Sequence, residues 1–391
     1  MKDENLGLLV HNPPYQGGIV QYCVLLSNSI NGKIKQNIVG FKSLYPPMFY
    51  KGKLPKINRS GIKFKQKSHN FVTWYNPFSW INAYNFLKKN DVIHLQWVSP
   101  LLTPLQYVIL KLNKWFAKKP ILLTCHNIEP HESTPLDKIF TKAIFSNVTA
   151  FVVHAKQNKE RLISDYKIKP QNIHIIPHGN FGFFKKWSKE TKQELKKEMS
   201  YNEEEIILLF FGYIREYKGL RYLLKALPGV LKQNPKVKLL IAGELWQKWD
   251  TYEEIIKEYK LQDYVKVIPN YIIDQDVHKY FNVSDIQVLP YYNTEQTISG
   301  PLLIGLAFGK PIIISPVGGI TELIKDGKNG LLFEVGNIKD LVFKINTLIK
   351  NRELQQTLSK NALILNESLS WDKVGKAYLE IYEKMIRRKN K

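Results

Sequence analysis

The stretch "EIILLFFGYIREYKGLRYLLKAL", residues 205–227, contains an apolar run, a short loop and a helical pattern, in that order. Continuous runs of Val, Ile, Leu and Phe are typical of strands covered on both faces, as in parallel sheets. The same alternation of apolar runs and helical patterns continues through both halves of the chain. We therefore expect an α/β protein with two doubly wound Rossmann-like domains.

Further apolar runs extend this prediction in both directions. In the first half, strands are predicted at residues 6–11, 91–97, 120–126, 150–155 and 173–179. In the second half, they are predicted at residues 205–213, 237–244, 265–271, 286–292, 311–317 and 330–335. Ligands of such sheets bind beyond the carboxyl ends of the strands, so the functional residues should lie just after these runs.

The domain boundary is placed in the lysine-rich stretch that follows the strand at 173–179. A chain of 391 residues exceeds what one core usually supports. We predict domains at 1–185 and 186–367, and a C-terminal helix at 368–391. Val374, Tyr378, Ile381 and Met385 recur at helical spacing in that last segment, and no strand follows it. The helix is therefore expected to pack back on the first domain.

The composition excludes several classes of protein. Two cysteines, Cys23 and Cys125, are too few for a disulfide scaffold or a zinc cluster and fit a reducing compartment. The N-terminal sequence has charges of both signs and only a short apolar run, which argues against a signal peptide. No apolar run is long enough to span a membrane.

The net charge of +23 favours a polyanionic partner such as nucleic acid, anionic lipid or a phosphorylated substrate. Part of the excess is local, because Lys51–Lys67 contains seven Lys or Arg residues and no acidic residue. The aromatic-rich residues 71–89 follow directly. This combination suits an anionic membrane surface, although a solvated basic face beside an ordinary core helix would have the same sequence.

Two cations follow the predicted strand at 205–213. Gly212, Arg215, Lys218 and Gly219 lie on the expected strand-to-helix loop. Arg can fork onto two phosphate oxygens while Lys acts as a point charge, so the pair suits a diphosphate. Two basic residues on a loop of so basic a protein could also have no function.

A second candidate for anion binding is "TEQTISGPLLIGLAFGKP", residues 294–311. Ser299 can cap a helix, Gly300 lets a ligand approach the backbone, and Pro301 is tolerated in a first turn. Free backbone N–H groups and the helix dipole would attract an anion there. An ordinary buried helix start is the alternative, but two such motifs in one domain are less easily explained by chance.

These motifs resemble glycosyltransferase family 4, whose members are retaining enzymes of the GT-B fold. The resemblance rests on residues 210–227, 239–244 and 285–337, and more loosely on "NPPYQGGIVQYCVLLSNSI", "VIHLQWVSP", "LTCHNIEPHE", "FVVHAKQNKERL" and "HIIPHGNF" in the first half. It implies two Rossmann-like domains facing across a cleft, with a nucleotide-sugar donor bound by the second domain and an acceptor by the first.

The resemblance also implies roles for individual residues. Arg215 and Lys218 would bind the donor diphosphate and stabilise it as a leaving group, and Gly212 precedes them. Ser299 and Gly300 would hold the distal phosphate through backbone donors. Gly17 and Gly18 would form the glycine-rich loop that approaches the donor. His126 would lie near the transferred sugar, although a histidine at a strand end can also be purely structural.

Other histidines and the metal requirement complete this set of expectations. His131, His154 and His178 also follow strands or lie in loops, and His178 is expected to be structural. Members of the family generally need no metal. The resemblance therefore implies an enzyme that has no metal or other cofactor.

The sequence departs from the family at one point. Many members have two glutamates eight residues apart around this turn, but the matching positions are Gln296 and Ile304. Glu295 lies one residue out of register and could reach the donor sugar, whereas nothing replaces a carboxylate at Ile304. The residue at that position usually holds the ribose hydroxyls, so ribose recognition is in doubt.

We expect a glycosyltransferase that transfers a hexose to a glycan or lipid-linked saccharide in bacterial surface polysaccharide synthesis. It is expected in the cytoplasm, with peripheral binding to the inner face of the membrane. A degenerate protein that binds a glycan or a partner without catalysis is the alternative. A nucleic-acid-binding protein is a weaker alternative, because no reader motif is present.

Overall fold

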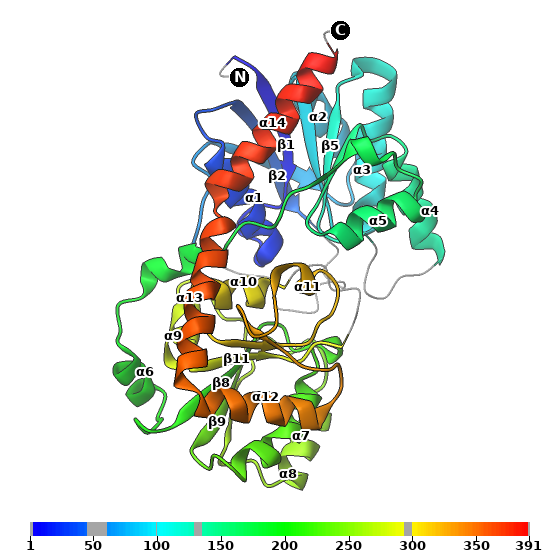
Figure 1. The fold of residues 1–391 in the computed structure, drawn as a ribbon. Coiled ribbons are helices and arrows are strands. Elements are labelled where there is room, and N and C mark those ends of the chain that lie inside the picture. Colours follow the sequence, from blue (N-terminus) through cyan, green and yellow to red (C-terminus); the bar gives the residue numbers. More distant parts are fainter. Residues whose placement is uncertain (1–2, 45–60, 99, 129–134, 293–298, 390–391) are drawn as a thin grey trace. The chain divides into compact units, whose positions relative to one another are not determined.

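The chain forms two compact units. A computed structural model describes residues 3–44, 61–98, 100–128, 135–292 and 299–389. The first unit comprises Met1–Gly179 and Leu369–Lys391, and the second comprises Asn180–Ser368. The first unit is therefore built from both ends of the chain (Figure 1).

The first unit contains a parallel sheet with the strand order β3-β2-β1-β4-β5-β6-β7. Its strands are β1 (Asn5–Val10), β2 (Lys35–Ser43), β3 (Ser68–Thr73), β4 (Val92–Trp97), β5 (Ile121–Cys125), β6 (Ala150–Val153) and β7 (Ile173–Ile175). The direction of the strand order reverses between β1 and β4. Ligands of doubly wound sheets bind at such a reversal, beyond the carboxyl ends of the strands.

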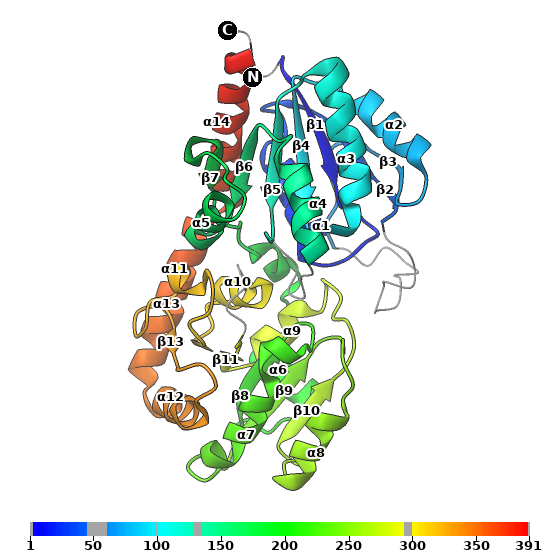
Figure 2. The ribbon, with the colours of Figure 1, turned by 90° about the vertical axis from the view of Figure 1, so that its right-hand side faces the viewer.

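Helices cover both faces of this sheet. They are α1 (Gly18–Ser29), α2 (Pro77–Leu87), α3 (Thr103–Leu112), α4 (Pro135–Phe145), α5 (Lys156–Ser164) and α14 (Trp371–Lys389). Helices α1 and α14 pack against each other and share one core cluster with the sheet. Right-handed crossovers place α2, α3 and α4 together on the opposite face, as Figure 2 shows.

The C-terminal helix completes the core of the first unit. Its apolar positions, spaced three and four residues apart, contact the sheet and α1. These residues are Val374, Tyr378, Ile381, Tyr382, Met385 and Ile386. Removing α14 would leave this face of the sheet exposed to water.

Strands β2 and β3 were missed by the sequence prediction. Strand β2 begins with the polar residues Lys35, Gln36 and Asn37, and β3 begins with Ser68, His69 and Asn70. Strand β3 lies at the edge of the sheet. Edge strands are commonly polar, because this discourages pairing with other chains, so the continuous apolar run used to find the other strands is missing here.

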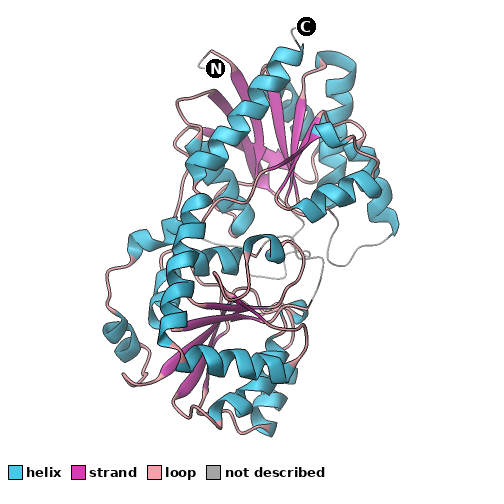
Figure 3. Cartoon of the chain, viewed as in Figure 1, coloured by secondary structure: helices cyan, strands magenta, loops and turns pink. Residues whose placement is uncertain are grey.

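The second unit contains a parallel sheet with the order β10-β9-β8-β11-β12-β13. Its strands are β8 (Ile206–Phe211), β9 (Val237–Ala242), β10 (Val265–Ile268), β11 (Ile286–Leu289), β12 (Ile312–Ile314) and β13 (Leu331–Leu332). Each lies within a predicted apolar run, and the two parallel sheets confirm the predicted fold class (Figure 3). The strand order reverses between β8 and β11.

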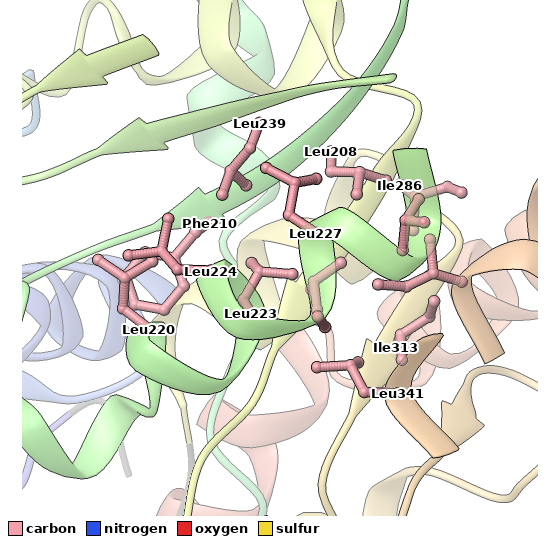
Figure 4. Close-up of a cluster of buried hydrophobic side chains, with 14 of the residues drawn as sticks. Leu208, Phe210, Leu220, Leu223, Leu224, Leu227, Leu239, Ile286, Ile313 and Leu341 are labelled. Carbon is pink, nitrogen blue, oxygen red and sulfur yellow. The ribbon is translucent and has the colours of Figure 1, made fainter. Parts of the chain in front are cut away.

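The helices of the second unit surround this sheet. They are α6 (Lys192–Glu198), α7 (Leu220–Leu231), α8 (Asp250–Glu258), α9 (Val277–Val283), α10 (Gly300–Ala307), α11 (Ile320–Leu323), α12 (Ile338–Lys350) and α13 (Arg352–Ser368). Helix α7 directs Leu220, Leu223, Leu224 and Leu227 towards the sheet (Figure 4). Burial of each such side chain contributes about 1.5–3 kcal/mol, so the start of α7 is firmly held.

Candidate functional site

Three loops meet at the reversal of strand order in the second unit. They follow β8, β9 and β11, and backbone hydrogen bonds join them to one another. Ile214 N donates to Glu244 O at 2.9 Å, and Trp246 N donates to Ile214 O at 3.1 Å. Tyr292 N donates to Tyr217 O at 3.1 Å. These backbone hydrogen bonds hold the three loops, and the side chains that they carry, close together.

Arg215 lies at the end of the first of these loops and stacks on an aromatic ring. Its guanidinium carbon is 3.9 Å from the centre of the Trp246 ring. The Trp246 ring is itself packed on Tyr213, with ring centres 4.9 Å apart, and its Nε1–H donates to Glu244 Oε2 at 3.2 Å. A cation on an aromatic face keeps its N–H donors available in the plane of the guanidinium.

Lys218 is buried beside Arg215. It ends a 3₁₀ turn, Glu216–Lys218, and its Nζ lies 5.5 Å from the centre of the Tyr291 ring. Burial and, to a smaller extent, the Arg215 charge lower the pKa of Lys218 to about 7. No ion pair of Lys218 with a carboxylate occurs among the residues that the structure describes. An anion placed here would stabilise the charged amine.

The start of α10 lies next to these cations. Ser299 caps the helix, because its Oγ accepts from Leu302 N at 3.2 Å, and this Oγ is also 2.7 Å from the Tyr291 hydroxyl. Tyr291 therefore contacts both the cap and Lys218. A Cβ at Gly212 would lie 2.8 Å from Pro301 Cγ and 3.2 Å from Lys218 Nζ.

The structure thus gathers Gly212, Lys218, Ser299 and the helix start in one place, with Arg215 beside them. Gly300 is the first residue of α10, and a Cβ there would lie 3.8 Å from Phe181 Cε2, an ordinary van der Waals contact. Leu302 N and Leu303 N donate to Ser299, and proline has no N–H. The Gly300 N–H at this helix start and two nearby cations form an anion-binding arrangement.

The positions that depart from the family pattern are only partly described. Ile304 is buried within α10. Glu295 and Gln296 lie outside the described residues, as does His131. The prediction for Glu295 at the donor site therefore stays a prediction.

In the first unit, Gly17 and Gly18 form the start of α1. Gly17 is the N-cap, and its φ of 102° lies in the region that favours glycine. Gly18 is the first helical residue. This helix start follows β1. It therefore lies beyond the carboxyl ends of the strands, where the strand order reverses.

His126 follows β5 and therefore also lies beyond the carboxyl ends of the strands. It is buried, and its backbone N donates to Trp97 O at 3.0 Å. Its Nε2 is 2.9 Å from Gln96 Oε1, and its ring meets the Tyr22 ring edge to face with centres 4.7 Å apart. Burial holds the pKa of His126 well below its usual value, and the neighbouring histidines lower it further. The ring is therefore neutral at physiological pH.

His154 and His178 lie beside the same Tyr22 ring. His154 Nδ1 is 2.9 Å from Ile176 O, and His178 Nδ1 is 2.7 Å from Gly179 O. Both rings pack on Tyr22. The backbone partner of His178 agrees with a structural role.

His11, at the end of β1, differs from the other histidines. Neither of its ring nitrogens has a hydrogen-bond partner among the described residues, and burial lowers its pKa to about 4. It was not predicted as a site residue, although the sequence places it directly after an apolar run.

Two family descriptions match separate halves of the chain. Residues 191–363 match "Glycosyl transferases group 1", and residues 49–179 match "Glycosyltransferase Family 4". The chain belongs to glycosyltransferase family 4. The matched segments contain the cations after β8, the start of α10 and His126.

Curated relatives of this family 4 glycosyltransferase are distant. Spore coat protein SA of Bacillus subtilis is 27% identical over 209 residues, which is 51% of this chain and 55% of the relative. The uncharacterized glycosyltransferase MJ1178 of Methanocaldococcus jannaschii is 29% identical over 314 residues, which is 78% of this chain and 80% of the relative. The chain spans 55%, 58% and 60% of the length of three of the curated relatives it matches.

A solved structure shares the fold of this glycosyltransferase. The structure of Anabaena HepE in complex with UDP-glucose aligns with 97% of this chain and 100% of that chain, with a TM-score of 0.75 and 15% identity. This likeness shows the GT-B fold.

Sequence reasoning missed three residues that contact predicted site residues, two in the second unit and one in the first. Trp246 carries Arg215, Tyr291 joins Lys218 to Ser299, and Gln96 contacts His126. Trp246 and Tyr291 lie directly after or within predicted strands at 237–244 and 286–292, so their positions were informative. Gln96 is a polar residue in an otherwise apolar strand, which is a signal for a buried hydrogen bond.

Metal and membrane features of the glycosyltransferase can be stated for the described residues alone. There, no group of three His, Cys, Asp or Glu side chains is arranged to hold a metal ion. In the same part of the chain, no helix combines the length and the apolar character that a membrane crossing requires.

Proposed function

We propose that this protein is a retaining glycosyltransferase that uses a nucleoside diphosphate sugar. The observation that supports it most is the arrangement of Arg215, Lys218 and the start of α10 at the reversal of strand order in the second unit. Two cations beside a helix start match the charge of a diphosphate. Anabaena HepE has the same fold, and its solved structures are complexes with UDP or UDP-glucose.

The proposed chemistry is the cleavage of a glycosyl phosphate bond. Negative charge builds on the diphosphate as the bond breaks, and positive charge builds on the sugar. Arg215 and Lys218 would stabilise the leaving diphosphate, and preorganised donors of this kind contribute about 2.7–4 kcal/mol each. The N–H groups at the start of α10, beside Ser299 and Gly300, would hold the distal phosphate.

The first unit would bind the acceptor and provide His126. Its neutral, buried ring suits an interaction with an uncharged sugar hydroxyl rather than with the phosphates. Gly17 and Gly18 would let the donor approach the start of α1 closely, because neither has a side chain. The acceptor is proposed to be a hydroxyl of a glycan or a lipid-linked saccharide used in bacterial surface polysaccharides.

A panel of nucleotide sugars tests this proposal. Purified protein is incubated with UDP, GDP, ADP and dTDP sugars, and release of the nucleoside diphosphate is measured with and without saccharide acceptors. We expect one donor to be turned over and Arg215→Ala to reduce its turnover by about 10²–10³-fold. Binding without turnover of any donor would support the degenerate binding protein instead, and near wild-type turnover by Arg215→Ala would refute the donor site.

The proposed reaction needs no metal, because Arg215 and Lys218 supply positive charge where the diphosphate would lie. Turnover should therefore be unchanged by EDTA. Loss of turnover with EDTA and recovery with Mg²⁺ would show that a metal shares this task.

We also propose that the protein works in the cytoplasm and binds the inner face of the membrane peripherally. Helices α2 and α3 of the first unit and the turn after α3 would make this contact. Exposed apolar residues on α2, α3 and the π-helical turn Asn113–Ala117 form what we name the α2–α3 face, namely Phe78, Ile81, Tyr107, Trp115 and Phe116. Phe78, Trp115 and Phe116 are 77%, 65% and 72% exposed. Helices α2 and α3 pack against each other.

The charges around the α2–α3 face favour an anionic lipid surface. Neither α2, α3 nor the π-helical turn contains an acidic residue. Lysines occur in or directly after these elements in the sequence, and they are Lys88, Lys89, Lys111, Lys114, Lys118 and Lys119. Aromatic residues at headgroup depth with lysines around them are typical of interfacial binding. Most of the basic run Lys51–Lys67, which first suggested a membrane, lies outside the described residues.

A further inference from the structure

A buried hydrogen-bond network connects the C-terminal helix to His126. All of its members belong to the first unit. They are Tyr22 on α1, His94 and Gln96 on β4, Thr124 on β5, His126, and Tyr378 and Tyr382 on α14. Each of these side chains is at most 7% exposed.

His94 is the centre of this network. Its Nδ1 is 2.8 Å from the Tyr382 hydroxyl. Its Nε2 is 2.8 Å from Thr124 Oγ1 and 3.1 Å from Gln96 Nε2. The Thr124 hydroxyl is 2.7 Å from the Tyr378 hydroxyl, which is 2.7 Å from the Tyr22 hydroxyl.

The chemistry of these groups gives the proton positions a single order. An amide nitrogen can only donate, so Gln96 Nε2–H donates to His94 Nε2, which must be without a proton. Thr124 then also donates to that nitrogen, and His94 Nδ1–H donates to the Tyr382 hydroxyl. Burial lowers the pKa of His94 to about 3, so the ring stays neutral and keeps this pattern.

Gln96 extends this order of hydrogen-bond donors and acceptors to His126. The Gln96 amide is shared between the two rings, and its Oε1 can only accept. His126 Nε2–H therefore donates to Gln96 Oε1, and the basic nitrogen of His126 is Nδ1. If Gln96 turned its amide round, Nε2 would face His126 and the proton order along the whole network would reverse.

We propose that Gln96 is a positioning residue that fixes the tautomer of His126, and that Tyr382 of α14 fixes Gln96 through His94. This inference rests on the proposed function, because it gives His126 its role at the transferred sugar. Leaving one buried polar group without a partner is unfavourable, so each member of the network constrains the others. The C-terminal helix thereby contributes to the site without reaching it.

Three substitutions separate positioning from packing. Gln96→Met keeps the length of the side chain and removes both hydrogen bonds. Gln96→Glu keeps an acceptor for His126 and loses the donor to His94. Tyr382→Phe keeps the ring and removes the partner of His94 Nδ1. Tyr166→Phe is the matched control, because Tyr166 is buried in the same unit outside this network.

The tautomer of His126 is the direct measurement. Proton–nitrogen NMR spectra of ¹⁵N-histidine-labelled full-length protein distinguish the two neutral tautomers, and His126→Asn identifies the signals of His126. We expect a proton on Nε2 in the unsubstituted protein and in Tyr166→Phe, and a mixture of tautomers in Gln96→Met. A proton on Nδ1 in the unsubstituted protein would overturn the inference, as would an unchanged tautomer in Gln96→Met.

The kinetic measurements follow from the same reasoning. Gln96→Met should lower kcat by about 10- to 100-fold with the donor KM unchanged. This is less than the about 10²–10⁴-fold of a positioned proton-transfer group, because the His126 ring itself is kept. Tyr382→Phe should lower kcat less. Gln96→Glu should raise the pKa of His126, because a carboxylate favours its charged form, so kcat should fall at acidic pH.

Failure of the inference and failure of the proposed function have different outcomes. If Gln96→Met changes the tautomer but not kcat, or raises the donor KM instead, the positioning role is wrong and the transferase stands. If no nucleotide sugar is turned over by the unsubstituted protein, the proposed function is wrong, and the tautomer result still decides what Gln96 does to His126.

Discussion

Arg215 lies on the face of Trp246, with 3.9 Å between the guanidinium carbon and the centre of the ring. The two residues come from loops after adjacent strands, β8 and β9, and backbone hydrogen bonds join these loops. An aromatic face holds a guanidinium without neutralising it, whereas a carboxylate would compete with a phosphate. The cation is thus held in place and stays available for an anion.

Trp246→Ala should weaken binding of a nucleoside diphosphate, because Arg215 loses its support. A cation–π contact contributes about 0.5–2 kcal/mol, so we expect the Kd to rise by about 2- to 30-fold in calorimetric titrations. Trp246→Phe keeps an aromatic face and should bind more tightly than Trp246→Ala. Equal affinities for the unsubstituted protein and Trp246→Ala would show that the ring does not hold Arg215.

Lys218 should make nucleotide affinity depend on pH. Its pKa is lowered to about 7 by burial and by the Arg215 charge, so the amine loses its proton as the pH rises above 7. A diphosphate binds the charged amine, and its affinity should therefore fall by up to about tenfold per unit between pH 7 and 9. A terminal phosphate, with a second pKa of about 6, is already fully charged there.

Lys218→Arg is the control for this dependence, because a guanidinium stays charged throughout that range. Its affinity for the nucleotide should be flat between pH 7 and 9. The same slope in both proteins would assign the titration to another group.

The pair of Tyr291 and Ser299 should stabilise the start of α10. Ser299→Ala removes the cap and should lower the free energy of unfolding by about 0.5–2 kcal/mol. Tyr291→Phe removes only the hydrogen bond to Ser299 and should cost about 0.5–1.5 kcal/mol. Urea unfolding measures both, and the prediction fails if neither substitution changes the midpoint.

Gly219 should tolerate no side chain. A comparison with Gly327 separates the steric clash at Gly219 from backbone strain. Gly219 and Gly327 both have a φ of 69°. A Cβ at Gly219 would collide with the Pro290 carbonyl oxygen, whereas nothing lies within 4 Å of a Cβ at Gly327. Both substitutions by Ala incur about 1–2 kcal/mol of backbone strain, but only Gly219→Ala adds a steric clash and should also impair nucleotide binding.

The outcome is read from urea unfolding and nucleotide titration of the two variants. Gly219→Ala should be clearly less stable than Gly327→Ala. Equal losses of stability would mean that the loop containing Arg215 and Lys218 can move away from Pro290.

The α2–α3 face should bind anionic vesicles. Replacing both Trp115 and Phe116 by Ala should reduce co-sedimentation with phosphatidylglycerol vesicles, because the exposed rings can no longer enter the headgroup layer. Binding should also weaken as salt is added, because the lysines contribute through charge.

Phe343→Ala is the matched control for an exposed aromatic residue. Phe343 is 64% exposed and belongs to α12 of the second unit. This substitution should leave vesicle binding unchanged. Equal binding to phosphatidylcholine and phosphatidylglycerol vesicles would count against the proposed membrane surface.

The fold was predictable wherever strands are covered on both faces. The runs that contain β8 and β11 are apolar throughout, because helices cover both sides of a parallel sheet. Strands β2 and β3 lack this signal: polar residues begin both strands, and β3 has only one neighbour. Strand β2 depends on pairing with β1, and β3 depends on pairing with β2, which the local sequence does not encode.

The candidate site was predictable where a local motif carries the chemistry. Arg215, Lys218 and the capped start of α10 each follow a strand, so their positions could be read along the chain. Trp246 and Gln96 act through partners that lie far away in sequence or on a neighbouring strand. Only tertiary contacts show that Trp246 lies under a guanidinium and that Gln96 lies between two histidines.

The division of the first unit between both ends of the chain affects how this protein folds as it is made. Residues 369–391 leave the ribosome after the whole of the second unit. Until then α1 and the sheet lack the apolar face of α14, and His94 and Thr124 lack their tyrosine partners.

Domains of most chains fold in the order of their synthesis. Here the second unit can finish folding while the first unit still lacks α14. The nascent chain therefore exposes the apolar surface of an incomplete N-terminal unit until α14 has emerged. Termination of synthesis before residue 369 would release a chain in which only the second unit is complete.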